Sequence, residues 1–250
     1  MDALEALRIV QADYCSAISA QTVEQSYRDL FKIGLVQPCE GLSLCDVGGG
    51  LGAFGPACAI LGASVTVIDD FKDPVNFKVG EAGFIAHRKH GVQVVVADAS
   101  RGLPVDRQFD TVTCFASIEH YHDSPRAMLH SMMDHLKPGG RFVLSVPNAV
   151  DLMKRIETVL GRAKWSPLEE WYATAEFRGH VREPVVSDLE FIARDLELQK
   201  WRVVGKTFIW IGTPTVRRIF GAIARVVDHR AGLSSELFLV GYKADTAHAS

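Results

Sequence analysis

The chain has 250 residues, 48% of them hydrophobic, and its 27 lysines and arginines nearly balance its 30 aspartates and glutamates, which gives a formal net charge of −3. A chain of this length and composition is expected to form one domain with a substantial core. Its balanced charge offers no broad attraction for a polyanion, which argues against nucleic acid as a partner.

The sequence carries no pattern that predicts export or membrane insertion. It opens without a signal-peptide pattern, and no apolar run approaches the roughly 18 residues that a spanning helix needs. Its five cysteines show no CxxC spacing, and two of them lie in apolar runs that predict buried strands. We therefore expect reduced thiols and a cytoplasmic location.

Residues 1–40 predict two helices that cap the domain. The second helix is expected to begin at a capping box formed by Thr22 and Gln25 and to end at Gly34. The side chains expected to face inward from it are Tyr27, Leu30 and Phe31.

Residues 41–148 alternate strand patterns with helical patterns. Strands are expected at residues 42–47, 64–69, 92–99, 111–116 and 141–146. Helices are expected at residues 56–61, at about 80–90, and after Ser124 and Pro125, where Pro138 and the two following glycines end the helix. The apolar face of that last helix is expected to carry Met128, Leu129, Met132, Met133 and Leu136. Such alternation predicts a doubly wound, mostly parallel α/β sheet covered by helices on both faces.

The alternation breaks after Asn148. Residues 149–186 begin with an amphipathic helix and continue into an aromatic and polar stretch, which predicts a lid inserted after the fifth strand. Residues 187–243 then predict a helix that begins at a capping box of Ser187 and Glu190, followed by strands at 201–211 and 236–243. These two strands bring the expected sheet to seven.

Residues 214–227 predict an amphipathic helix inserted between the last two strands. One face carries Val216, Ile219, Phe220, Ile223, Val226 and Val227, and the other carries Arg217, Arg218 and Arg225. Most surface helices bury such an apolar face against their own domain. The alternative is that this helix contacts the apolar part of a substrate or makes a weak peripheral contact with an anionic membrane surface.

A glycine-rich turn follows the first expected strand. Gly50, Gly52 and Gly55 satisfy the GxGxxG fingerprint of dinucleotide-binding proteins, which is a weak signal by itself. The larger pattern is DxGxGxG, which starts at Asp46 and includes Gly48. In this pattern an acid closes the strand, and glycine lets backbone N–H groups approach a ligand at the positive end of the following helix.

With this loop the chain resembles the class I S-adenosylmethionine-dependent methyltransferases of small-molecule type, over roughly residues 42–148. The resemblance also includes Asp69 closing the second strand, Asp98 closing the third, FDTVTCFASIEHYHDSP at the fourth and LKPGGRFVLSVPN at the fifth. It implies a Rossmann-like fold, S-adenosylmethionine as the cofactor and a small-molecule acceptor. Asp46, Asp98 and the LKPGG run disfavour a nicotinamide dehydrogenase.

The chemistry of S-adenosylmethionine assigns roles to these residues. The methionine end is expected to lie against Asp46 and the backbone of Gly48, Gly49, Gly50 and Gly52. The ribose is expected to bind Asp69, with Asp70 either sharing that contact or remaining solvated. The adenine is expected to bind Asp98 and the backbone of Ala99 and to pack near Phe71, and Phe115 at the end of the fourth strand completes the set. Turn chemistry alone also favours aspartate at strand ends, which is the plainer explanation.

The segment after the fourth strand carries the candidate base. The carboxyl end of that strand faces the crevice where such folds bind ligands. His120 is expected to take the acceptor's proton, with His122 as the competitor, although either ring can instead cap a helix or bind a backbone carbonyl. Glu119, His120 and Asp123 can also be considered as metal ligands. Their spacing matches no strong template and methyl transfer does not require a Lewis acid, so no metal is expected.

The expected lid supplies the candidate acceptor site. Its aromatic and hydrogen-bonding side chains suit a polar or sugar-like ligand, unless the segment packs as ordinary surface. The residues chosen are Trp171, Tyr172, His180 and Arg182. The sequence thus predicts O-methylation of a small hydroxylated acceptor, such as a sugar or a lipid-linked saccharide, by direct in-line transfer. Alternatives are N- or C-methylation and a cofactor-binding module without turnover.

Overall fold

The computed structural model describes residues 1–14, 23–162, 166–208 and 227–245. Its helices are α1 (Ala3–Asp13), α2 (Val23–Val36), α3 (Phe54–Ile60), α4 (Pro74–Lys89), α5 (Arg126–Asp134), α6 (Leu152–Val159), α7 (Leu168–Ala173) and α8 (Val186–Asp195). Its strands are β1 (Ser43–Val47), β2 (Ser64–Asp69), β3 (Gln93–Val96), β4 (Phe109–Phe115), β5 (Leu136–Pro147), β6 (Gln199–Lys206) and β7 (Glu236–Tyr242).

The strands described form one seven-stranded sheet in the order β3-β2-β1-β4-β5-β7-β6. Strands β1 to β5 pair in parallel, and β7 pairs antiparallel with both β5 and β6. The chain runs outward from β1 to β3 and then returns to the other side of β1, so β1 and β4 flank the topological switch point where such sheets bind ligands. The prediction of a doubly wound, mostly parallel seven-stranded fold is confirmed.

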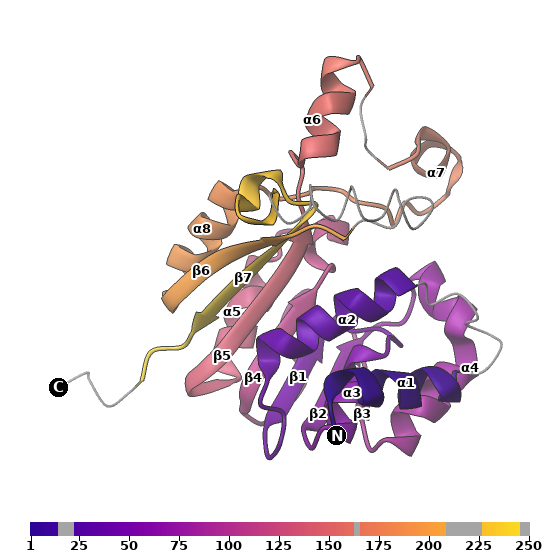
Figure 1. Ribbon diagram of the computed structural model, residues 1–250, viewed down its shortest axis with the longest axis vertical. Coiled ribbons are helices and arrows are strands. Elements are labelled where there is room, and N and C mark those ends of the chain that lie inside the picture. The colour runs from indigo at the N-terminus through magenta and orange to yellow at the C-terminus, as the bar shows by residue number, and fades with distance from the viewer. Residues whose placement is uncertain (15–22, 163–165, 209–226, 246–250) are drawn as a thin grey trace.

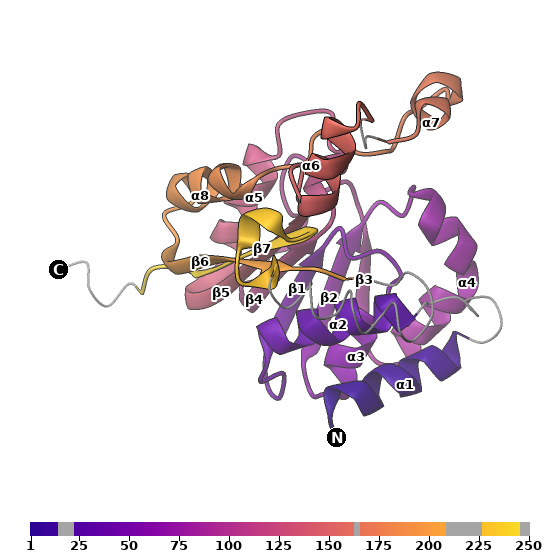
Figure 2. The ribbon, with the colours of Figure 1, turned by 45° about the horizontal axis from the view of Figure 1, so that its top comes forward.

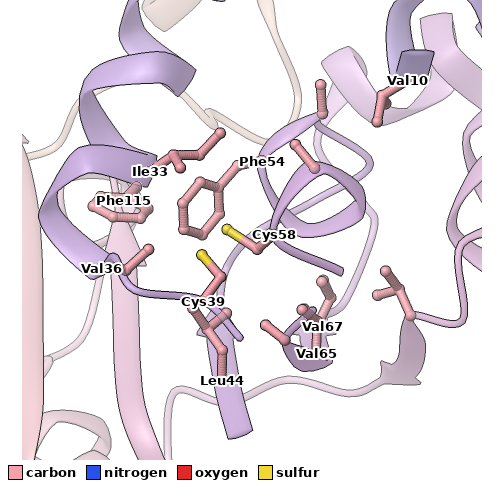
Figure 3. Close-up of a cluster of buried hydrophobic side chains, with 14 of the residues drawn as sticks. Val10, Ile33, Val36, Cys39, Leu44, Phe54, Cys58, Val65, Val67 and Phe115 are labelled. Atoms are coloured by element: carbon pink, nitrogen blue, oxygen red, sulfur yellow. The ribbon is translucent and has the colours of Figure 1, made fainter. Parts of the chain in front are cut away.

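Helices cover both faces of the sheet, as Figure 2 shows, with α5 and α8 on one face and α1, α2 and α3 on the other. Each face has its own apolar cluster. The cluster beneath α1, α2 and α3 contains the residues labelled in Figure 3, where the thiols of Cys39 and Cys58 lie among aliphatic and aromatic side chains. The cluster beneath α5 and α8 includes Met128 and Leu189. Of the five cysteines, the four in described residues are buried and free; Cys15 lies outside the described ranges.

The N-terminal helices differ from the sequence-based expectation in two places. Helix α2 continues through Gly34 to Val36, because the stop comes from Pro38, whose ring disfavours helical backbone in the residue before it. Tyr27 is 54% exposed instead of facing inward, whereas Leu30 and Phe31 pack against the core. The expected capping residue Thr22 lies outside the described residues.

Other helix boundaries also move. Helix α4 begins at Pro74, and Gly80, expected to begin it, instead takes a non-helical conformation at a kink within it. In α5, Pro125 is the N-cap, and Ser124 Oγ accepts from the N–H of Arg126. Leu136 belongs to β5, since it pairs with Phe109 of β4, so α5 ends before the KPGG run.

Helix α8 also begins two residues early, with Val185 as the N-cap in place of Ser187. The capping box of Ser187 and Glu190 does not form. The carboxylate of Asp188 instead accepts from the N–H of Val185 at 3.1 Å, which caps the helix from a different register.

The segment between β5 and α8 carries α6 and α7. Figure 1 shows both helices standing outside the two helical layers, beyond the end of β5. Neither helix has a buried residue, so this part of the predicted lid has little packing against the domain. The predicted helix at 214–227 falls almost entirely outside the described residues. In the part of the chain that is described, no helix is both long and apolar enough to cross a membrane.

Candidate functional site

The glycine loop after β1 is packed so closely that side chains cannot be added at two of its positions. Gly48 has φ +68° and Gly50 has φ +56°, both in the left-handed region that glycine tolerates best. A Cβ at Gly48 would lie 2.2 Å from Oγ of Ser117, and a Cβ at Gly49 would lie 2.3 Å from a carboxylate oxygen of Asp46. Close packing and left-handed backbone thus account for glycine at positions 48 and 50 of the pattern, and close packing accounts for Gly49 between them.

Three side chains from distant parts of the chain hold this loop. The Tyr14 hydroxyl donates to the carbonyl oxygens of Leu51 at 2.7 Å and Gly52 at 3.0 Å. The Oδ1 atom of Asn76 accepts from the N–H of Leu51 at 3.1 Å. The third is Asp69, described below. Tyr14 and Asn76 are not among the residues predicted from the sequence, because nothing in the patterns around them indicates a contact with the glycine loop.

Asp46 lies buried under the loop. Its carboxylate accepts from Oγ1 of Thr113 at 2.7 Å. Burial raises the pKa of Asp46 to about 7, although the hydrogen bond from Thr113 and the nearby Lys32 ammonium oppose the shift. Because burial disfavours the charged form of Asp46, a ligand's ammonium group bound next to this carboxylate would stabilise that charged form.

This raised pKa predicts a pH-dependent stability. The unfolded chain releases the Asp46 proton near pH 4 and the folded chain near pH 7, so this group's stabilising contribution is lost as pH rises through that window. Asp46→Asn does not titrate. Its free energy of unfolding, relative to wild type, should therefore rise by about 1.4 kcal/mol per pH unit between pH 4 and 7. Urea denaturation of both unliganded proteins at several pH values measures this. A constant difference would mean that Asp46 is already ionised at the low end.

Asp69 closes β2 and reaches back to the loop. One carboxylate oxygen accepts from the N–H of Gly50 at 3.0 Å and the other from the N–H of Phe71 at 2.6 Å. Asp70 lies 3.9 Å from the guanidinium of Arg178 in the lid segment. Phe71 is buried and packs on Phe84 with ring centroids 5.0 Å apart. Asp69 thus orders the loop as well as facing the switch point.

The remaining candidate cofactor residues, Asp98, Ala99 and Phe115, differ in their exposure. Asp98 is exposed and accepts from the N–H of Ser100 at 2.9 Å, a bond that lowers its pKa. Ala99 beside it is buried. Phe115 is buried against Phe54, with ring centroids 5.0 Å apart, so its ring belongs mainly to the core.

Both candidate bases contact the lid segment. His120 lies in a short 3-10 helix, Ile118–His120, directly after β4. Its Nδ1 is 2.7 Å from the carbonyl oxygen of Arg178, and Nε2 of His122 is 3.0 Å from the carbonyl oxygen of Phe177. Because a carbonyl can only accept, each of these nitrogens donates its proton. His120 is half-buried, and with Nδ1 donating, Nε2 is the nitrogen that can accept in its neutral ring, whereas His122 is exposed.

Only one of the four candidate acceptor residues lies beside His120. The His180 ring is 4.9 Å from the His120 ring, edge to face, and its Nδ1 is 2.6 Å from a carboxylate oxygen of Glu183. Trp171 and Tyr172 are 60% and 81% exposed on α7. Arg182 is exposed and pairs with Asp188. The side chains of these three residues are exposed, and the N–H of Arg182 donates to the carbonyl oxygen of Glu119 at 3.3 Å.

Glu119 is the acid nearest to the two histidines. Its side chain is buried, burial raises its pKa to about 7, and neither carboxylate oxygen has a hydrogen-bond partner. Its backbone oxygen accepts from the N–H of Val181, which ties β4 to the lid segment. Asp123, considered with Glu119 in the sequence analysis, is exposed and stands apart. The sequence analysis did not foresee that Glu119 lies beside His180.

Comparison with known proteins agrees with this geometry. A family model described as a methyltransferase domain matches residues 21–203. A mitochondrial ubiquinone biosynthesis O-methyltransferase from Schizosaccharomyces pombe is 32% identical over 120 residues, 48% of this chain and 42% of the relative. A ubiquinone biosynthesis O-methyltransferase from Pseudomonas paraeruginosa is 31% identical over 175 residues, 67% of this chain and 69% of the relative. The chain thus spans less than half of the first relative.

Solved structures share the fold at low identity. An S-adenosylmethionine-dependent methyltransferase from Mesorhizobium loti superposes with a TM-score of 0.55 and 18% identity, covering 86% of this chain and 97% of that one. The N-methyltransferase NodS from Bradyrhizobium japonicum, in complex with S-adenosyl-L-homocysteine, gives 0.54 and 14%, covering 95% and 98%. Identities this low establish the fold alone.

The sheet order, the switch point and the glycine loop define the class I methyltransferase fold. The chain belongs to the methyltransferase domain family, and S-adenosylmethionine is its cofactor. The family, enzyme class and cofactor that the sequence predicted are confirmed.

Proposed function

We propose that this protein transfers the methyl group of S-adenosylmethionine to a hydroxyl oxygen of a small acceptor. The observation that carries the proposal is the position of His120 after the carboxyl end of β4, where Nδ1 donates to the carbonyl oxygen of Arg178, so that Nε2 is the nitrogen that accepts a proton when the ring is neutral. The relatives named as O-methyltransferases support oxygen as the nucleophile.

The reaction is an in-line displacement. The acceptor oxygen forms a bond to the methyl carbon while the bond from that carbon to the sulfonium breaks, which leaves neutral S-adenosylhomocysteine. The protein's main task is to align the two reactants. A hydroxyl must also lose its proton, and in this proposal that loss depends on His120.

The cofactor is proposed to lie across the switch point. Asp46 and the loop Gly48–Gly52 would face its methionine end, and Asp69 its ribose. The adenine would lie between Phe71 and the stretch of Asp98 and Ala99. Support comes from the positions of the first two groups at the ends of β1 and β2, which are neighbouring strands.

Asp69→Ala should weaken binding of S-adenosylhomocysteine by roughly 1.5 to 3 kcal/mol, the scale for losing hydrogen bonds to a charged group. The substitution removes the proposed ribose contact and also the acceptor that orders the N–H of Gly50. Calorimetric titration measures the change, and thermal unfolding of the unliganded variant shows whether the loop still folds. Unchanged affinity in a folded variant would reject the ribose role.

The acceptor class is the finer part of the proposal. The sequence favoured a sugar or a lipid-linked saccharide, and the polar pair of His180 and Glu183 beside His120 suits a hydroxylated ligand. Turnover with labelled cofactor against simple sugars, phenols and amines tests this. Methylation of amines alone would contradict O-methylation, and methylation of phenols without sugars would contradict only the saccharide as the acceptor.

The cytoplasmic location and the lack of a nucleic acid partner stay predictions.

A further inference from the structure

Three side chains from two distant segments meet at the carboxyl end of β4. Glu119 and His120 lie in the 3-10 helix, and His180 belongs to the lid segment. One carboxylate oxygen and one nitrogen from each imidazole all lie within 4.8 Å of one another. Among the described residues this is a group with the donor types of a divalent metal site.

The carboxylate in this group has no partner of its own. Glu119 is 1% exposed, and both of its side-chain oxygens lack hydrogen bonds. An ionised carboxylate is strongly disfavoured in a buried place without partners, so a cation beside such a group would stabilise its charged form. A cation between the two histidines and Glu119 would lie in that position.

The two histidines are already oriented as metal ligands usually are. His120 donates from Nδ1 to the Arg178 carbonyl oxygen, and His180 has Nδ1 against the Glu183 carboxylate. Glu183 is in turn paired with the Lys154 ammonium. In metal sites the second ring nitrogen is commonly held by a carbonyl or a carboxylate in this way, which leaves Nε2 free to bind the ion. The structure therefore contains both the ligands and their outer partners.

We infer that Glu119, His120 and His180 bind a divalent transition-metal ion, with Zn²⁺ as the probe of choice. Two imidazoles and one carboxylate favour Zn²⁺, Mn²⁺ or Fe²⁺ over Mg²⁺ and Ca²⁺, which prefer all-oxygen sites. Bonds of about 2.0 to 2.2 Å from zinc to each ligand bring the ligand atoms closer to one another than the 4.8 Å within which they lie in this structure. Binding should therefore draw the His180 segment toward β4. This reverses the expectation, drawn from the sequence, that no metal is bound.

The site deepens the proposed function and rests on it for its chemical role. Three protein ligands leave positions open for a substrate oxygen. An acceptor hydroxyl bound there loses its proton to water more easily, because the ion stabilises the resulting oxyanion. The oxyanion then takes the methyl group from the sulfonium. His120 would assist proton loss as a ligand to the ion, and so would not itself receive the proton.

The binding experiment uses the full chain after dialysis against EDTA. Calorimetric titration with ZnCl₂ should show saturable binding at one ion per chain, and Co²⁺ bound in its place should show a perturbed visible spectrum. Glu119→Gln and His180→Ala should each weaken Zn²⁺ binding by more than roughly 100-fold. Glu183→Gln, which removes only an outer partner, should weaken it by roughly 10- to 100-fold. His122→Ala changes an exposed neighbouring imidazole and should leave binding unchanged.

Two results would overturn the metal site. One is the absence of saturable Zn²⁺ binding to the wild-type chain. The other is equal affinity in wild type, Glu119→Gln and His180→Ala, with thermal unfolding showing that the variants are folded. Neither result bears on O-methylation, which the acceptor panel tests separately. If Zn²⁺ binding follows the three residues but turnover survives EDTA, the site stands and its role in methyl transfer is rejected.

Discussion

His120→Ala is expected to lower kcat by roughly 100- to 10,000-fold, the range seen when a group that assists proton transfer is removed. Affinity for S-adenosylhomocysteine should stay nearly intact, because the His120 ring contacts Arg178 and His180, neither of which is among the residues proposed to hold the cofactor. Its ring contacts the lid segment through the Arg178 carbonyl, so the variant should be checked by thermal unfolding. Steady-state kinetics and calorimetry with the same protein give both values.

His122→Ala is the matched control for this experiment. Both rings donate to a carbonyl oxygen of the lid segment, Arg178 for one and Phe177 for the other. Loss of the lid contact alone should therefore affect both variants similarly, whereas loss of chemistry should affect only His120→Ala. If His122→Ala abolishes turnover and His120→Ala retains it, the assignment is wrong.

Gly48→Ala is expected to destabilise the unliganded protein by about 2 to 5 kcal/mol. The left-handed backbone at this position costs a non-glycine residue about 1 to 2 kcal/mol, and overpacking against Ser117 adds about 1 to 3 kcal/mol. Relief of the clash would move the loop or Ser117, so cofactor affinity should fall as well. Urea denaturation and titration with S-adenosylhomocysteine measure the two effects.

Gly52→Ala lies in the same loop and provides the comparison. Its backbone is outside the left-handed region, and the nearest atom to an added Cβ is the Gly49 carbonyl oxygen at 3.7 Å, an ordinary contact. Its stability should change by less than about 1 kcal/mol, the range of a substitution that fits its surroundings. Equal destabilisation by the two substitutions would show that the steric argument for Gly48 does not hold.

Helix boundaries are the part of the fold that local sequence patterns predicted least well. The sequence placed the end of the second helix at Gly34, since glycine often ends helices, and the start of the fourth at about Gly80. In the fold α2 runs to Val36 and α4 begins at Pro74 with Gly80 at an internal kink. A glycine permits a break without requiring one, so the neighbouring packing and the nearby prolines decided these ends.

The sequence by itself determined the class of fold and the position of the cofactor loop. Both depend on neighbouring residues: strand and helix periodicity reflects which face is buried, and the acid and glycines at the end of β1 form one tight turn. The acids that close β1 and β2 could be brought together from the sequence because parallel neighbours end at the same edge of a sheet.

Only the tertiary structure decided which side chains support those motifs. Tyr14 reaches the glycine loop from 37 residues away, and the carbonyl that orients His120 belongs to Arg178, 58 residues along the chain. Glu119 and His180 meet because the segment after α7 folds back over the end of β4, where Val181 donates to the Glu119 carbonyl. The periodicity of hydrophobic residues does not predict such contacts. They depend on the path that the chain takes between distant segments and on which buried polar groups still need a hydrogen-bond partner.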